Sequence, residues 1–431
     1  MEETQNQETK TVTFDEFGFS DQLMESLDAM NFKSPTPIQQ QAVPIIMEGK
    51  DIIACAQTGT GKTAAYLLPV LNKLTESPTE NIDTLILAPT RELVLQIDQA
   101  LTGFSYFCSV SSMAIYGGGD GGGFEREKNA LTKGANVIVA TPGKIISHLN
   151  LGYVKISQLR HFILDEADRM LDMGFLEDIL KVINFLPQER QNLLFSATMP
   201  KRIRDLAAKI LVEPAEVNIA ISKPAERIVQ AAFSVYNPQK IPLLVYLLRA
   251  KELRSVIIFC STKSNTKAIE KELIKEKFKA RAIHSDLEQS DREKVLRDFK
   301  NHELNILVAT DILSRGIDIE NIDLVINVDV PHDAEDYVHR IGRTARAAAS
   351  GVAFTFINPD EQYKFHRIEE LIEKEVPKAR LPEEIGEGPA YDPKNRRGGR
   401  GGGGGRPKGN GGGSRGGGYR KKKGKPGHHR R

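Results

Sequence analysis

The sequence predicts an α/β protein with two domains, each built around a parallel sheet. The chain has 431 residues, which is more than one domain usually holds. Short apolar runs that end in small or polar residues alternate with helical patterns, and this alternation is typical of βαβ units. The alternation is interrupted at residues 213–226, where Pro214 and Pro224 lie, and then starts again. Two α/β domains joined by a short linker explain these observations.

The apolar runs give the predicted strands in chain order. In the first domain they are Asp51–Ala56, Thr84–Ala88, Asn136–Ala140, His161–Leu164 and Asn192–Ser196. In the second domain they are Ser255–Cys260, Lys279–His284, Asn305–Ala309, Leu324–Val328 and Val352–Ile357. The expected organisation is a disordered leader at residues 1–11, a first domain at 12–213, a linker at 214–226, a second domain at 227–377 and a disordered tail at 378–431.

Charge is unevenly distributed along the chain. The formal net charge is +2, from 59 Lys and Arg against 57 Asp and Glu. The segment Lys394–Arg431 contains 14 of these basic residues, no acidic residue and 16 of the 36 glycines. It has too few apolar residues to offset the entropy of ordering, so a disordered basic tail is expected. A flexible polycation favours a nucleic-acid partner, with a solubilising role or a membrane-surface contact as the alternative.

Several classes of protein are excluded by composition. No run of 18 or more apolar residues is present, which excludes a single long apolar membrane-spanning helix. The polar N-terminal residues resemble neither a secretory signal nor a transit peptide. The cysteines Cys55, Cys108 and Cys260 are far apart and form no disulfide or zinc pattern. These features favour a cytoplasmic protein.

A glycine-rich segment, Ala56–Thr63, follows the first predicted strand and precedes a helical pattern. Strand, glycine-rich turn and helix form the phosphate-binding P-loop, in which backbone amides surround phosphate oxygens. Lys62 is expected to reach the β- and γ-phosphates, and the Thr63 hydroxyl is expected to bind Mg²⁺. A chance match to the pattern is the alternative. The other predicted nucleotide contacts of this loop are Gln57, Thr58, Gly59, Thr60 and Gly61.

An acidic sequence, Asp165–Asp168, follows the predicted strand His161–Leu164. The carboxyl ends of strands in such sheets face the ligand crevice, so an acid here suits a Mg²⁺ contact. Asp165 is the predicted Mg²⁺ partner, through water, because Mg²⁺ retains several waters. Glu166 is predicted to orient or deprotonate the attacking water. An exposed acidic turn without catalytic function is the alternative.

Together, Ala56–Thr63 and Asp165–Asp168 resemble the motifs of the DEAD-box ATP-dependent RNA helicases. The resemblance extends from Phe14 to Ile357, and further motifs occur in the order of the family. They are the Q motif at Phe32–Gln39 with Phe14 upstream, motif Ia at Pro89–Leu93, the glycine pair Gly117 and Gly118, motif Ib at Thr141–Gly143, motif III at Ser196–Thr198, motif IV at Ile258–Thr262, the element Gln289 to Arg292, motif V at Ala309–Asp311 and Arg315–Asp318, and motif VI at His339–Arg346.

The resemblance implies two RecA-like domains with ATP, Mg²⁺ and RNA bound across a cleft. Gln39 and Thr36 would read the adenine, with Phe32 stacked on it and Phe14 as the upstream aromatic. Asp318 would approach the ribose. Arg343 and Arg346 would be arginine fingers, with His339 in the same closed site. Ser196, Ala197 and Thr198 would couple the ATP site to domain closure. The implied RNA contacts are Pro89, Thr90, Arg91, Gly117, Gly118, Thr141, Pro142, Thr262, Arg292, Thr310, Asp311, Arg315 and Gly316.

The implied function is RNA-stimulated ATP hydrolysis coupled to local separation of short RNA duplexes and to remodelling of RNA–protein complexes. Single-stranded RNA or short duplexes would be bound through the backbone, without sequence preference in the two domains. The expectation is a monomeric bacterial protein, with ribosomal or RNA-decay assemblies as possible partners. A DNA helicase or translocase of the same superfamily is one alternative, and a non-enzymatic RNA chaperone is the other.

Overall fold

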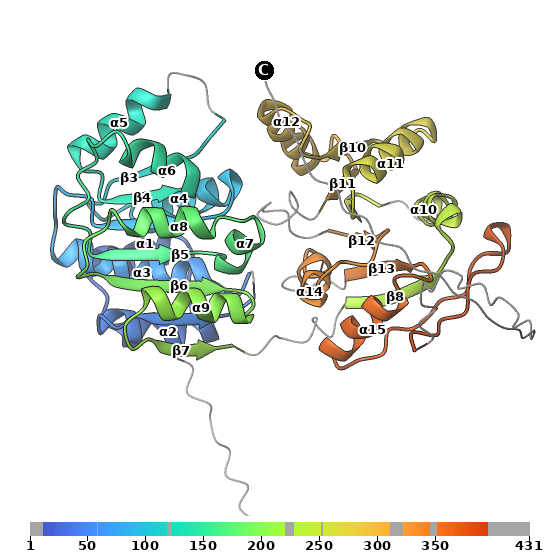
Figure 1. The fold of residues 1–431 in the computed structure, drawn as a ribbon, viewed down its shortest axis with the longest axis horizontal. Helices are drawn as coiled ribbons and strands as arrows, with labels where there is room; N and C mark the ends of the chain where they lie inside the picture. The colour runs from blue at the N-terminus through green and yellow to red at the C-terminus, as the bar shows by residue number, and fades with distance from the viewer. Residues whose placement is uncertain are drawn as a thin grey trace, which may run out of the picture. The chain divides into compact units, whose positions relative to one another are not determined.

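The computed structural model describes residues 12–57, 59–118, 123–219, 228–250, 253–310, 322–344 and 351–394. These residues form two parallel sheets with helices packed on both faces, as Figure 1 shows. The predicted α/β class is therefore confirmed. In the described part of the chain, no helix is both long enough and apolar enough to cross a membrane.

The first sheet has the strand order β3-β4-β2-β5-β6-β1-β7, and all neighbouring strands are parallel. Each strand therefore ends at the same edge of the sheet, where the loops that follow can meet. The strands are β1 (Ile52–Cys55), β2 (Thr84–Leu87), β3 (Ser112–Ile115), β4 (Val137–Ala140), β5 (His161–Leu164), β6 (Gln191–Ser196) and β7 (Ala215–Asn218).

Helices cover both faces of this sheet, because its central strands are apolar on both sides. In β6, Leu193 and Phe195 belong to one core and Leu194 to the other. The first core contains α1 (Asp21–Ala29), α2 (Pro37–Met47), α3 (Lys62–Glu76) and α4 (Arg91–Phe104), with the short 3-10 helix η1 (Phe14–Phe17). The second contains α5 (Gly123–Lys133), α6 (Pro142–Leu149), α7 (Ala167–Asp172), α8 (Leu176–Ile183) and α9 (Lys201–Ile210).

The second sheet has the order β10-β11-β9-β12-β13-β8, again with parallel neighbours. Alternate residues of its central strand β9 enter two separate cores, so helices cover both faces here too. Its strands are β8 (Ile228–Ser234), β9 (Val256–Cys260), β10 (Ala280–Ile283), β11 (Ile306–Thr310), β12 (Leu324–Asn327) and β13 (Gly351–Ile357). Its helices are η2 (Asn237–Gln239), α10 (Lys240–Arg249), α11 (Lys263–Lys275), α12 (Gln289–Lys300), α14 (Ala334–Ile341), α15 (Gln362–Leu371) and η3 (Glu383–Ile385).

Three strands were not predicted, and each lies at the edge of its sheet. They are β3 and β7 in the first sheet and β8 in the second. Edge strands are covered less completely, so their sequences need no continuous apolar run. In β7 only Val217 is buried. Placing Ala215–Asn218 in the linker was wrong, because these residues pair with β1 along its full length.

The start of the predicted disordered tail was also wrong. Residues 378–394 are described, and they pack against the second sheet and its helices. Ala379 donates its amide to the Ala232 carbonyl of β8 at 2.8 Å, and the Tyr391 ring meets Phe365 edge-on at 6.3 Å. We call residues 378–393 the C-terminal strap. The remainder of the tail, residues 395–431, and the leader, residues 1–11, lie outside the described residues.

Candidate ATP and RNA site

The P-loop connects β1 to the N-terminus of α3. Gly59 and Gly61 have φ values of +82° and +92°, a region that suits glycine. A Cβ atom on Gly61 would lie 2.5 Å from Gln39 Nε2, so a larger residue does not fit without movement. The loop is closed by the Thr60 hydroxyl, which donates to the Gln57 carbonyl at 2.7 Å. This geometry exposes backbone amides at the start of a helix, where anions bind.

Lys62 is the first residue of α3 and is buried. Its ammonium has no hydrogen-bond partner among the residues that the structure describes. A buried charge without a partner is costly, so the position requires an anion to compensate it. A phosphate in the P-loop would supply that anion.

The acidic residues lie at the end of β5, beside the P-loop. Asp165 is 2% exposed, and its Oδ1 accepts a hydrogen bond from the Glu166 amide at 2.9 Å. Burial raises the pKa of Asp165 to about 6, and the nearby positive charge of Lys62 opposes this rise. Glu166 is also buried, and its Oε2 lies 3.2 Å from Arg169 Nη1. The structure therefore brings Lys62, Asp165 and Glu166 together, and their catalytic roles remain predictions.

Hard oxygen donors at this site fit a Mg²⁺–nucleotide complex. Thr63 provides a hydroxyl and Asp165 a carboxylate, and Mg²⁺ is usually held by one or two such groups together with substrate phosphates. No cluster of three or more His, Cys, Asp or Glu side chains that could hold a metal by itself occurs in the described residues. The donor set therefore suits a metal that arrives with a nucleotide.

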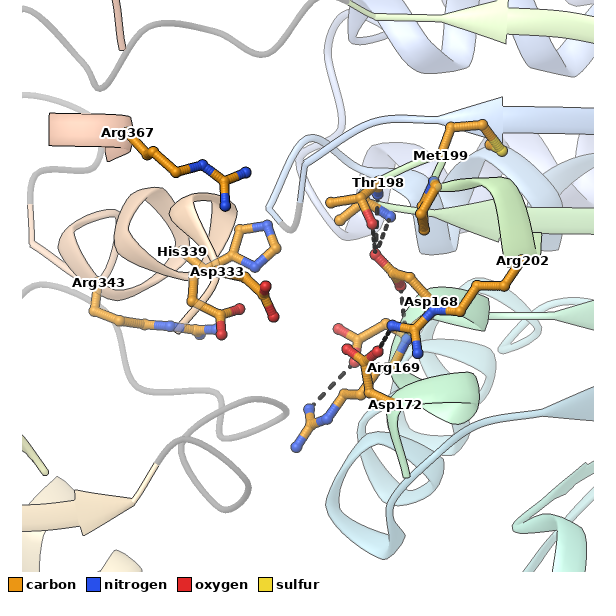
Figure 2. Close-up of a pocket in the computed structure, with 14 residues that line it drawn as sticks. Asp168, Arg169, Asp172, Thr198, Met199, Arg202, Asp333, His339, Arg343 and Arg367 are labelled. Atoms are coloured by element: carbon orange, nitrogen blue, oxygen red, sulfur yellow. Dashed lines mark hydrogen bonds and ion pairs between the residues drawn. The ribbon is translucent and has the colours of Figure 1, made fainter. Parts of the chain in front are cut away.

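Asp168 connects the acidic motif to motif III. Its Oδ2 accepts hydrogen bonds from the Ala197 amide at 3.2 Å, the Thr198 amide at 2.9 Å and the Thr198 hydroxyl at 3.0 Å. Figure 2 shows Asp168 and Thr198 facing each other through these contacts. The Ser196 hydroxyl donates to the Thr198 carbonyl at 2.7 Å, which fixes the same turn. The segment predicted to couple ATP to closure is thus tied to the acidic motif by the Asp168 carboxylate.

The Q motif lies against the P-loop. Gln39 Nε2 donates to the Gly61 carbonyl at 3.1 Å, and its Oε1 accepts from the Thr36 amide at 2.9 Å. Phe32 is half-buried and meets Phe104 edge-on at 5.1 Å. Phe14 is only 2% exposed, so its ring offers little surface to a base in this conformation. Its predicted nucleotide contact remains a prediction.

Predicted RNA contacts of the first domain gather at helix N-termini. Thr90 is the N-cap of α4 and accepts from the Leu93 amide at 3.3 Å, and Thr141 is the N-cap of α6, followed by the buried Pro142. Arg91 Nη1 donates to the Gly118 carbonyl at 3.3 Å. Such N-termini attract phosphate. Pro89 is buried just before Thr90, and Gly117 precedes Gly118.

Corresponding residues of the second domain follow its strands. Thr262 caps α11 after β9 and accepts from the Asn265 amide at 3.2 Å. Thr310 ends β11. Arg292 on α12 donates to the Ser285 carbonyl at 2.9 Å. Because β9 and β11 are parallel neighbours, Thr262 and Thr310 lie at the same edge of the second sheet.

His339 on α14 and Arg343 just after this helix line the pocket drawn in Figure 2, together with Glu166 and Thr198 of the first domain. Arg343 is 9% exposed. The other predicted residues of motifs V and VI, together with one P-loop residue, lie outside the described residues; they are Thr58, Asp311, Arg315, Gly316, Asp318 and Arg346.

Comparisons with known proteins agree with this arrangement. The DEAD/DEAH box helicase profile matches residues 36–206, and the helicase conserved C-terminal domain profile matches residues 239–348. The chain is 40% identical over 370 residues to the ATP-dependent RNA helicase CshA of Listeria monocytogenes, covering 86% of this chain and 70% of the relative. The chain belongs to the DEAD-box RNA helicase family. It is an ATP-dependent RNA helicase, whose ATP hydrolysis depends on RNA.

Further relatives and solved structures agree with this membership of the DEAD-box family. CshA of Bacillus subtilis is 40% identical over 374 residues, which cover 86% of this helicase and 75% of the relative. Among solved structures, S. cerevisiae Dbp5 bound to RNA and ADP BeF3 has a TM-score of 0.76 at 30% identity, covering 85% of this chain and 95% of that one. Mss116p bound to ssRNA and AMP-PNP has a TM-score of 0.77 at 28% identity, covering 88% and 81%. These matches confirm the two RecA-like domains and decide against the DNA-translocase and chaperone alternatives.

Some residues of the helicase site were missed by the sequence analysis. Tyr66 donates its hydroxyl to Asp165 Oδ2 at 2.8 Å from a different element. Arg340 is 3% exposed, and its Nη1 donates to Asn327 Oδ1 at 2.9 Å and to the Asp329 carbonyl at 3.0 Å. Asp329 Oδ2 in turn accepts from the Ser261 amide at 2.8 Å, which links motif VI to motif IV. No pattern in the sequence signals these contacts, since they depend on packing between distant segments.

Proposed function

We propose that ATP binds this helicase at the P-loop, with Mg²⁺ held by Thr63 directly and by Asp165 through water. Bound Mg²⁺ would neutralise charge on the phosphates. Lys62 pairs with the β- and γ-phosphates, and the backbone amides from Gln57 to Thr63 surround them. Gln39 and Thr36 read the adenine edge, while Phe32 stacks on the base and Phe14 is the upstream aromatic of the nucleotide site.

Glu166 orients the attacking water and takes its proton. Arg343 and Arg346 of the second domain stabilise the charge that develops on the γ-phosphate, with His339 beside them. Asp318 contacts the ribose. Each domain therefore holds part of the catalytic set, and hydrolysis requires both parts. Ala197 and Thr198 respond to nucleotide through their bonds to Asp168, and Ser196 through its bond to the Thr198 carbonyl.

RNA binds through its sugar-phosphate backbone at the helix N-termini of both domains. Thr90, Thr141 and Thr262 each begin a helix, which supports this assignment. The structures of Dbp5 bound to RNA and Mss116p bound to ssRNA are consistent with a single strand as the bound form. ATP and RNA both bind the same closed state, and this shared preference couples ATP hydrolysis to local separation of short RNA duplexes. The helicase acts as a monomer in the cytoplasm and remodels RNA–protein complexes, ribosomal or RNA-decay assemblies among them.

The main support for the proposed ATP site is the buried ammonium of Lys62. It has no hydrogen-bond partner among the described residues, and it lies beside Asp165 and Glu166. We expect Lys62→Ala to weaken nucleotide binding by about 10- to 100-fold, since a hydrogen bond to a charged group contributes about 1.5–3 kcal/mol. A fluorescent ATP analogue titrated in the presence of Mg²⁺ measures this. Lys50→Ala is the matched control, because that side chain is 62% exposed and its ammonium pairs with Glu48 at 2.7 Å. Parent-like affinity of Lys62→Ala would contradict the site.

A further inference from the structure

Tyr66 lies on α3 within the core of the first domain. It follows Lys62 and Thr63 by four and three residues, so the three side chains share one face of the helix. The Tyr66 side chain is fully buried, and its ring meets Phe195 of β6 edge-on at 5.1 Å. A ring fixed in this way holds its hydroxyl in one place.

The Tyr66 hydroxyl contacts Asp165, one of the two residues that we assign to Mg²⁺. It donates to Asp165 Oδ2 at 2.8 Å, while Asp165 Oδ1 accepts from the Glu166 amide at 2.9 Å. Both oxygens of the carboxylate are thus held by donors from different elements.

The direction of this hydrogen bond follows from the protons available. An ionised carboxylate has no proton to give, so Tyr66 donates its single hydroxyl proton to Asp165. With one donor on each oxygen, the carboxylate is fixed in orientation. Its remaining lone pairs would then be available to a water bound to Mg²⁺.

We propose that Tyr66 is a positioning residue for Mg²⁺, which orients the Asp165 carboxylate through one buried hydroxyl. This inference rests on the proposed function, because it assumes that Asp165 serves a bound Mg²⁺. Groups that orient metal ligands typically change metal affinity by about 10- to 100-fold when they are removed. Tyr66 does not contact nucleotide in this account.

The test is Tyr66→Phe, which removes one oxygen and keeps the ring that packs on Phe195. The affinity for a fluorescent ADP analogue is measured without RNA, first without Mg²⁺ and then over a Mg²⁺ titration. We expect the Mg²⁺ concentration at half-saturation to rise by about 10-fold or more, while the affinity without Mg²⁺ stays at the parent value. Tyr337→Phe is the matched control, since Tyr337 is also fully buried and its hydroxyl donates to Gln230 in the second domain at 2.9 Å.

Three results would overturn the inference or its basis. An unchanged Mg²⁺ midpoint in Tyr66→Phe would refute the positioning role. A Tyr66→Phe variant that also fails to bind nucleotide without Mg²⁺ would refute it too, because Tyr66 would then support the fold of the site. If nucleotide binding by the parent chain does not respond to Mg²⁺ at all, the proposed Mg²⁺ site itself is wrong.

Discussion

Glu166 occupies a backbone conformation that few residues with side chains adopt. Its φ of +50° and ψ of +50° lie in the left-handed region, at the N-cap of α7. For a residue with a Cβ this conformation costs about 1–2 kcal/mol, and such strain collects at functional sites. In this protein the left-handed conformation of Glu166 turns the chain sharply after β5, which places Asp165 and Glu166 at the end of the strand.

We expect Glu166→Gln to lower the maximal ATP turnover by about 10²- to 10⁴-fold, the range for losing a general base. The amide keeps the size of the side chain but cannot take a proton from water. Affinities for nucleotide and RNA should remain at the parent level. A phosphate-release assay at saturating RNA measures the change. The control is Glu177→Gln on α8, an exposed glutamate outside the site. Turnover at the parent rate in Glu166→Gln would refute the role of Glu166.

At the scale of elements, the C-terminal strap is an integral part of the second domain. Tyr391 donates its hydroxyl to Glu369 Oε2 at 2.7 Å, and Gln362 Nε2 donates to the Ala390 carbonyl at 2.7 Å. Gln239 Nε2 donates to the Ile385 carbonyl at 3.0 Å. These contacts connect η2 and α15 to residues that follow the last strand of the sheet.

We predict that a chain ending at Pro377 is less stable than one ending at Pro393. Losing the hydrogen bond from Tyr391 to Glu369 alone should cost about 1.5–3 kcal/mol, which corresponds to roughly 3–12 °C in the melting temperature of a domain of this size. Thermal unfolding followed by circular dichroism compares the two truncations with the full chain. Equal melting temperatures for the two truncated chains would show that the strap contributes nothing to the fold.

The elements differ in how clearly the sequence signals them. Central strands and the P-loop could be predicted, because burial on both faces demands apolar runs and phosphate binding demands a short contiguous motif. The edge strand β7 could not, since only Val217 of its residues is buried. The sequence of the C-terminal strap has no periodic apolar pattern, because the strap is held by hydrogen bonds to its carbonyls and by contacts of isolated side chains. The contact from Tyr66 to Asp165 joins residues 99 positions apart, so it appears only after packing.

At the scale of the whole molecule, a basic tail follows two domains that are acidic overall. Lys394–Arg431 contributes 14 positive charges and no catalytic motif. Its expected role is to raise the local concentration of RNA, because Lys and Arg that neutralise phosphates release counterions. This role makes RNA capture dependent on salt and leaves catalysis to the two domains.

Deleting residues 394–431 should leave the saturated ATP turnover nearly unchanged and raise the RNA concentration at half-maximal stimulation. If about half of the 14 charges meet phosphates, the salt dependence of single-strand binding should become shallower by roughly five units of log–log slope. ATPase titrations with RNA at several salt concentrations compare the full chain with one ending at Pro393. If the salt slope and the RNA concentration at half-maximal stimulation are both unchanged, the tail only confers solubility.

RNA-stimulated phosphate release by Arg343→Ala tests most directly whether the second domain completes the ATP site. We expect ATP binding to the first-domain P-loop to survive, while stimulated turnover falls by about 10³-fold or more, as it does for arginine fingers. Arg297→Ala on α12 serves as a control outside motif VI. Parent-like RNA-stimulated turnover in Arg343→Ala would show that the second domain does not complete the ATP site.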